Sequence, residues 1–209
     1  IVVKTSYIFS TSRKTGTEKY NWKKIVDGPG FRTYPAMVSL APGIILTYGG
    51  QASDANFLNN AFIFSTSSTT EKEYQWQKSK DGPSPRAYHA MAPFDSTTML
   101  MYGGASNTDR IIGNNSFSDA FLYHMSINDK TEEEGQWIQT IHNGPGKRGC
   151  HQMASLDLDA GTILMYGGRY DAGNLLNDAY IASMQYNEKT KRKDVQWLPT
   201  TPGPGKRIY

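Results

Sequence analysis

The sequence predicts an all-β fold in which four-stranded antiparallel sheets repeat along the chain, and three observations support this prediction. Trp22, Trp76, Trp137 and Trp197 lie 54, 61 and 60 residues apart, so a unit of nearly constant length recurs. Apolar runs are short and are separated by breakers drawn from 20 Gly and 10 Pro, as in proteins made of many short strands. No stretch sustains an apolar period of 3.6 residues, so helix is not expected.

Four markers follow one another in the same order within each unit. A Gly-Pro pair comes six or seven residues after the Trp, an Arg follows four residues after that Gly, and Tyr-Gly-Gly follows sixteen or eighteen residues after the Arg. The arginines are Arg32, Arg86, Arg148 and Arg207, and the glycine doublets are Gly49-Gly50, Gly103-Gly104 and Gly167-Gly168. Self-similarity of this kind indicates a repeat architecture in which each copy is one small supersecondary unit.

Each unit contains four strand-like segments. The first begins at the Arg, the second is an apolar run into the glycine doublet, the third alternates small and aromatic residues, and the fourth carries the Trp. The first segments are 32–40, 86–93 and 148–156; the second read GIILTYGG, TTMLMYGG and GTILMYGG; the third read NNAFIF, SDAFLY and NDAYIA; the fourth read EYQWQKS, EGQWIQT and DVQWLPT.

The chemistry of each marker suits a sheet that packs against another sheet. Pro fixes φ in the Gly-Pro turn, and Gly, there and in the doublet, accepts backbone geometries closed to other residues. Tyr and Trp supply broad faces for the wedge between two sheets, and we expect the Arg to donate to buried loop carbonyls of the adjacent unit. One four-stranded sheet cannot bury both of its faces, so copies must stack, and stacking around an axis gives a β-propeller.

These markers resemble the kelch repeat over essentially the whole chain. The resemblance lies in the glycine doublets, the aromatic strand after each doublet and the Trp that follows, and PRAYHAM at 85–91 is similar to the long-blade PxPRxxH variety. It implies that residues 1–209 form a partial kelch propeller. The implied pieces are the outer strands of a preceding blade at 1–26, blades at 31–80, 85–141 and 147–201, and the first strand of a next blade at 205–209, with the remaining blades expected from the same longer polypeptide.

Composition narrows the classes of partner. The formal net charge is only +3, and the one basic block is KTKRK at 189–193, so we expect no nucleic acid partner. No apolar run reaches the roughly 18 residues of a membrane span, and the first ten residues lack the features of a signal peptide. Cys150 cannot form an internal disulfide, so the sequence leaves cytoplasmic, cytoskeletal and extracellular locations open.

Residues that differ between units are better candidates for function than residues that repeat. His89 and His151 stand three residues after an Arg and are interpreted as hydrogen-bonded structural histidines rather than metal ligands, because the first unit has Pro35 there. Cys150 replaces Tyr34 and Tyr88 of the other units, and we expect a small buried thiol.

The link after the second glycine doublet, at 105–117, is five residues longer than the other two, which makes it a candidate recognition loop. Kelch loops of this kind lie on one face of the propeller, so the resemblance places the variable links together. The predicted contact residues are Gln51, Asp54, Asp109, Arg110, Arg169 and Tyr170. Asn114 begins a glycosylation sequon, which would matter in a secreted protein.

The sequence favours a non-catalytic scaffold that binds proteins or builds a larger assembly, with no cofactor and no metal. One alternative is the propeller of a galactose-oxidase-like copper-radical oxidase, which resembles this family and needs Tyr and His ligands and a Cys–Tyr thioether. Another is an extracellular propeller that binds carbohydrate or has a structural role. Ser/His/Asp and P-loop patterns are absent from the sequence.

Overall fold

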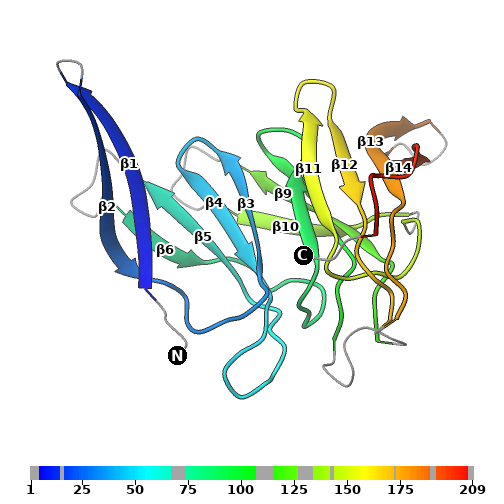
Figure 1. Ribbon diagram of the computed structural model, residues 1–209, viewed down its shortest axis with the longest axis horizontal. Helices are drawn as coiled ribbons and strands as arrows, with labels where there is room; N and C mark the ends of the chain where they lie inside the picture. The colour runs from blue at the N-terminus through cyan, green and yellow to red at the C-terminus, as the bar shows by residue number, and fades with distance from the viewer. Residues whose placement is uncertain are drawn as a thin grey trace.

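The computed structural model describes residues 5–14, 17–66, 74–106, 115–126, 134–141, 144–171, 173–188 and 192–206 of the 209. These residues form fourteen strands and contain no helix, so none of them belongs to a helix that could cross a membrane. The sheets fan out in chain order, from β1 and β2 on one side to β13 and β14 on the other (Figure 1). The all-β prediction is therefore confirmed.

The first sheet has two strands and each of the other three has four, all paired antiparallel in sequence order. The first consists of β1 (Thr5–Lys14) and β2 (Thr17–Asp27). The second consists of β3 (Ala36–Ala41), β4 (Ile44–Tyr48), β5 (Ala61–Thr66) and β6 (Tyr74–Lys78). The third consists of β7 (Ala90–Pro93), β8 (Thr98–Tyr102), β9 (Ala120–Ser126) and β10 (Glu134–Gln139). The fourth consists of β11 (Gln152–Asp157), β12 (Thr162–Tyr166), β13 (Ala179–Asn187) and β14 (Arg192–Pro199).

The core lies between successive sheets. Leu46 of β4 packs in one apolar cluster with Met99 of β8, whereas Leu100 of β8 packs in a second cluster with Ile163 of β12. Successive side chains of a strand point to opposite faces, so β8, which has a sheet on each side, is buried at every position. Among the described residues, another sheet covers only one face of β12, and the residues of β12 alternate between buried and half-buried.

The first strand of each four-stranded sheet begins four residues later than the sequence predicts. Arg32, Arg86 and Arg148 lie in the preceding links, and the strands begin at Ala36, Ala90 and Gln152. The reason is a left-handed residue in each link, with φ of 53° at Tyr34, 62° at Tyr88 and 55° at Cys150. A strand cannot run through a positive φ, so the ladder starts after it.

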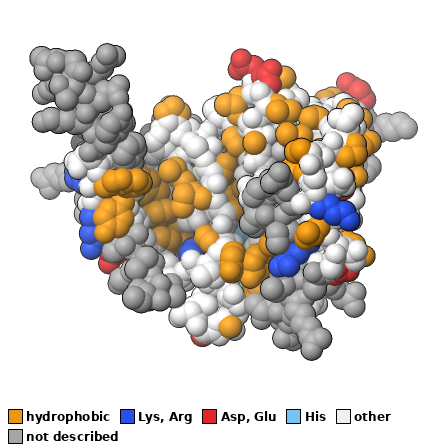
Figure 2. Space-filling view, viewed as in Figure 1, with side chains coloured by type: hydrophobic (Ala, Val, Ile, Leu, Met, Phe, Trp, Pro, Cys, Tyr) orange, Lys and Arg blue, Asp and Glu red, His pale blue; other side chains and the backbone are white. Residues whose placement is uncertain are grey.

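The two outermost four-stranded sheets each leave one face partly uncovered. Met37 of β3 is 57% exposed, whereas Met91 and Met153 at the same position of the later units are 7% and 9% exposed. On the opposite side, Leu156 of β11 is 55% exposed, whereas its counterpart Leu40 is 3% exposed. Figure 2 shows hydrophobic side chains in the hollow between the β1–β2 hairpin and β3. Trp22 of that hairpin is 66% exposed.

Candidate binding face

Neighbouring sheets are joined where the Tyr-Gly-Gly of one unit meets the Gly-Pro link of the next. The Tyr48 hydroxyl donates to the carbonyl of Ser84 at 2.5 Å, and the Gly50 amide donates to the carbonyl of Arg86 at 2.8 Å. The equivalent pairs at the next junction are Tyr102 with Gly146 at 2.6 Å and Gly104 with Arg148 at 2.9 Å. These markers therefore hold one sheet on the next.

The glycines of these markers are required for two different reasons. Gly49 and Gly50 have φ of 66° and 94°, the left-handed region that favours glycine, as the sequence predicts. Gly82 is different, because its φ is not in that region. A Cβ at Gly82 would overlap the ring of Tyr48, so this glycine leaves room for an aromatic ring of the preceding unit.

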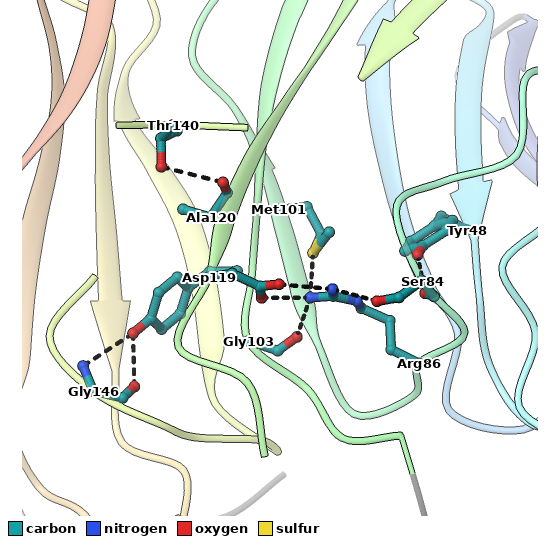
Figure 3. Close-up of polar contacts among 10 residues, drawn as sticks. Tyr48, Ser84, Arg86, Met101, Gly103, Asp119, Ala120, Thr140 and Gly146 are labelled. Carbon is teal, nitrogen blue, oxygen red and sulfur yellow. Dashed lines mark hydrogen bonds and ion pairs between the residues drawn. The ribbon is translucent and has the colours of Figure 1, made fainter. Parts of the chain in front are cut away.

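The repeated Arg forms a fork within its own unit, and the prediction that it donates to loop carbonyls of the adjacent unit is wrong. Arg86 is 1% exposed, and its two terminal nitrogens bind the carboxylate of Asp119 at 2.7 and 3.0 Å (Figure 3). The same guanidinium donates to the carbonyl of Gly103 at 3.0 Å and to the hydroxyl of Ser84 at 2.7 Å. It therefore ties the Gly-Pro link to the glycine doublet and to the residue before β9.

The other units repeat this fork with one change. Arg148 binds Asp178 at 2.8 Å through both terminal nitrogens and donates to the carbonyl of Gly167 at 3.1 Å. Arg32 finds Asn60 in place of the aspartate, at 3.1 Å. A neutral amide replaces the charge-assisted pair in the first unit, so that fork is the weaker one.

His89 and His151 lie between sheets. His89 meets the ring of Tyr48 edge-on at a centroid distance of 5.0 Å, and His151 meets Tyr102 in the same way at 5.5 Å. Burial lowers the pKa of each to about 3, and the nearby Arg86 and Arg148 act in the same direction, so both imidazoles are neutral at pH 7. The ring nitrogens of His151 have no hydrogen-bond partner among the described residues, contrary to the interpretation as a hydrogen-bonded histidine.

The left-handed residues form a backbone chain from unit to unit. The amide of Tyr88 donates to the carbonyl of Tyr34 at 3.3 Å, and the amide of Cys150 donates to the carbonyl of Tyr88 at 2.9 Å. The sequence interpretation used Tyr34 and Tyr88 only as counterparts of Cys150 and missed them as site residues. The available signal was a Tyr two positions after Arg32 and again two positions after Arg86, with Cys150 in the same place after Arg148.

Four of the predicted contact residues lie in the described links after the glycine doublets. Gln51 and Arg169 occupy the same place in their units, each bridged to the link that precedes the first strand. Asp54 is exposed, and Tyr170 is 44% exposed. Short-range bonds shape both links: Asp54 accepts from the amide of Asn56, and Asp171 accepts from Asn174.

The remaining predicted positions cannot be placed. Asp109, Arg110 and Asn114 of the long link, together with Arg207, lie outside the described residues. The described part of that link borders a pocket of about 370 Å³, lined by Ser106, Asn115, Ser116, Phe117, Ser118, Asp119 and Lys147. The carboxylate of Asp119, in the wall of this pocket, is already paired with the guanidinium of Arg86.

Comparison with known proteins agrees with this geometry. The model of a domain described as "KLHDC2/KLHL20/DRC7 Kelch-repeats domain" matches residues 3–191. The chain belongs to the kelch-repeat family. One relative of this kelch chain, an "adagio-like protein 2" of Oryza sativa subsp. japonica, is 20% identical over 188 residues, which are 88% of this chain and 28% of the relative. The kelch chain thus spans a little over a quarter of that protein.

Solved structures resemble the kelch chain in fold at low sequence identity. YjhT has a TM-score of 0.62 at 15% identity over 85% of this chain and 48% of its own. A chain in a cryo-EM structure of RAG with one melted and one unmelted RSS has a TM-score of 0.61 at 13% identity over 93% of this chain and 60% of its own. A fungal alcohol oxidase of the AA5 family, in complex with copper, has a TM-score of 0.53 at 14% identity over 90% of this chain and 47% of its own.

The copper-radical alternative requires side chains that converge on one metal ion. Within the described ranges, no group of three or more His, Cys, Asp or Glu side chains could hold a metal ion. His89 and His151 are packed between sheets against tyrosine rings. Each of these histidines therefore lies beside a tyrosine ring at a sheet junction.

Proposed function

We propose that this kelch chain is a non-catalytic scaffold that binds a protein partner through the links at the glycine-doublet end of its sheets. The supporting observation is that its repeated polar groups are buried and hydrogen-bonded within the fold. Arg86 and Arg148 are 1% and 2% exposed and are occupied by aspartates and glycine carbonyls, and the tyrosine hydroxyls of β4 and β8 are bonded to the next unit. Among the side chains that change from unit to unit, Asp54 and Tyr170 remain in contact with solvent.

The links are shaped before any partner arrives. In the first unit, Gln51 donates from its side chain to the carbonyl of Ala55 at 3.0 Å, while Asp54 accepts from Asn56. In the third unit, Asp171 accepts from the amides of Gly173 and Asn174. A link ordered in advance loses less conformational entropy on binding, and that favours a recognition role.

The uncovered sheet faces support a second part of the proposal, that the chain belongs to a larger assembly of the same repeat. Tyr48 and Tyr102 are fully buried under the next sheet, whereas Tyr166 at the same position is half-buried. The hydroxyl of Tyr166 already donates to the carbonyl of Gly205, and Gly203 lies against its ring, as Gly82 lies against Tyr48. We infer that a further four-stranded unit of the same repeat continues onto this face.

The test is affinity capture with quantified partners, using three forms of the chain. The first is the unaltered chain, the second carries Asp54→Lys with Tyr170→Ala, and the third has the link at 105–117 shortened by five residues. A control carries Lys78→Gln on the outer strand β6, where the side chain is 61% exposed. Partners lost from either link variant but retained by the control support the proposal, and identical partner sets for all forms would overturn it.

The same preparation distinguishes the other readings. Elemental analysis that finds one copper ion per chain would overturn the non-catalytic reading in favour of an oxidase. A glycan on Asn114, detected by mass spectrometry of the protein from its natural source, would place it in the secretory pathway and favour the extracellular alternative.

A further inference from the structure

His89 and His151 each fill the junction between their own unit and the preceding one. A Cβ on Gly49, in the preceding unit, would come within 2.9 Å of Cε1 of the His89 ring. A Cβ on Gly104, in the same unit as His89, would come within 2.9 Å of the Cβ of that histidine. The ring of His151 lies against Gly103 in the same way, at 3.1 Å. Each imidazole is therefore packed on the backbone of a glycine doublet.

The junction at His89 also holds both ends of a link on the proposed binding face. The backbone of Arg86, three residues before the histidine, is the point of attachment. Its carbonyl accepts from the amide of Gly50 at 2.8 Å, and its amide donates to the carbonyl of Leu58 at 3.1 Å. The link that follows the first glycine doublet is thus clamped at its beginning and at its end by one residue of the next unit.

The second junction repeats this clamp on the long link. The carbonyl of Arg148 accepts from the amide of Gly104 at 2.9 Å, and its amide donates to the carbonyl of Phe117 at 3.2 Å. The first glycine of the same doublet does not cross the junction, because the amide of Gly103 donates to the carbonyl of Asp119 in its own unit at 3.2 Å. Adjacent glycines therefore report on different contacts.

The surroundings of His89 are unfavourable for a positive charge. The titratable groups that face it are Tyr48 at the end of β4, the guanidinium of Arg86 and the imidazole of His151. Arg86 is 1% exposed and its terminal nitrogens already bind the carboxylate of Asp119, near the Tyr48–Ser84 contact (Figure 3). The backbone of Tyr48 acts to raise the pKa of His89, but burial and Arg86 outweigh it. A proton on this ring would place a second buried cation beside the first.

His151 has equivalent neighbours, with Tyr102 and Arg148 facing it and Asp178 paired with that arginine. Burial first, and the arginine second, hold the pKa of each histidine at about 3, against 6.5 for a histidine in water. An opened junction exposes its imidazole and lets it bind a proton that the closed junction excludes. Opening should therefore become about tenfold more favourable per pH unit as pH falls from 6.5 toward 3.

We propose that His89 and His151 form an acid latch: in mild acid each junction opens locally and releases the link that it clamps, while the sheets stay folded. The opening is local because the two apolar clusters between the sheets contain no histidine. The first unit has Pro35 at this position, so the latch is confined to the two junctions that carry a histidine. This inference rests on the proposed function, because it names a condition that regulates the same binding face.

The test is amide hydrogen exchange of the folded chain, followed by NMR at pH 7, 6 and 5 and corrected for the pH dependence of intrinsic exchange. Gly50 and Gly104 donate across a junction, whereas Gly49 and Gly103 donate to carbonyls of their own units, at 3.1 and 3.2 Å. Protection of Gly50 and Gly104 should fall about tenfold from pH 6 to pH 5, and that of Gly49 and Gly103 should not change.

Variants at each histidine should act on one junction only. His89→Gln should make the protection of Gly50 independent of pH while that of Gly104 still falls, and His151→Gln should do the reverse. His89→Phe repeats the first variant with an aromatic ring that cannot bind a proton, in case the amide does not pack. The matched control is His124→Gln, which removes an exposed histidine of β9 and should alter neither glycine.

Two exchange results would refute the latch. Equal loss of protection at all four glycines would show that acid unfolds the chain as a whole. Continued loss at Gly50 in both His89 variants would show that another group titrates.

Partner capture at two pH values tests the regulation. Partners captured at pH 7 should be released at pH 5 by the unaltered chain and retained by the variant with Gln at both histidines; full retention by the unaltered chain would overturn the regulatory role. The proposed function is decided separately, at pH 7, by the link variants. It stands if they lose their partners there, whatever the exchange experiment shows.

Discussion

Replacing Arg86 with methionine is expected to lower the free energy of unfolding by about 3 kcal/mol. Removing one partner of a buried ion pair costs roughly 3–5 kcal/mol, because a charge is left behind without compensation. Asp119 is 23% exposed and keeps some hydration, which places the expected cost at the lower end of that range. The carbonyl of Gly103 also loses a donor, so the fork fails at two points.

Equivalent substitutions at other basic residues of the chain give reference values for the effect of Arg86→Met. Arg148→Met should cost slightly less, because Asp178 is 34% exposed, and Arg32→Met should cost roughly 1–2 kcal/mol, because its partner Asn60 carries no charge. Lys78→Met removes an exposed ion pair to Asp81 and should cost about 0.5 kcal/mol or less.

The assay is urea unfolding followed by tryptophan fluorescence and by far-ultraviolet circular dichroism, with free energies compared at a common slope. Measurements at low and high salt should change the Lys78 result more than the Arg86 result, because salt screens exposed pairs. If Arg32→Met costs as much as Arg86→Met, the charge of Asp119 contributes nothing and the reasoning fails. If Arg86→Met falls within 1 kcal/mol of Lys78→Met, the fork does not hold the unit together.

Two further predictions concern the junction between sheets. Gly82→Ala should destabilise the fold by roughly 1–3 kcal/mol in the same urea assay, because the new Cβ overlaps the Tyr48 ring between two sheets. The control is Gly173→Ala, whose Cβ meets only one atom at 3.9 Å and which should change stability by no more than about 0.5 kcal/mol. Equal effects of the two substitutions would contradict the packing explanation. Between pH 6.5 and about 3, the unfolded chain binds protons at His89 and His151, whereas the folded chain keeps both imidazoles neutral. The free energy of unfolding should therefore fall as pH is lowered, by about 1.4 kcal/mol per pH unit for each histidine. Replacing both with Gln should flatten the stability curve between pH 6 and 4, and an unchanged slope there would show that neither histidine is held neutral.

The partner of each repeated arginine illustrates the limit of local pattern. The spacing of Arg86 from the Gly-Pro pair is visible in the sequence, but its ligand Asp119 lies 33 residues away, at the end of a link of unusual length. No repeat spacing reports which of several carbonyls or carboxylates lies within reach. The expectation that the arginine donates to carbonyls of the adjacent unit was therefore wrong. That the arginine has a structural role stays a prediction, which the Met substitutions can test.

The Gly-Pro glycine illustrates the same limit for packing. The sequence shows that Gly recurs there, and a special backbone geometry is the natural local explanation. The structure places Gly82 under the ring of Tyr48, so the requirement is space for a side chain that lies 34 residues earlier in the chain. A steric requirement imposed by a distant residue leaves no local trace other than the glycine itself.

By itself, the sequence determined the strand-by-strand order, the antiparallel sheets and the positions that repeat, because pleat alternation and turn geometry depend on residues close together in the chain. Only the tertiary structure decided that Tyr34, Tyr88, Cys150 and Arg169 meet at one end of the inner strands, and that Arg169 has no carboxylate there among the described residues. The physical reason is that these four side chains come from three units, and their distances are set by how the sheets stack around the axis, which no local pattern encodes.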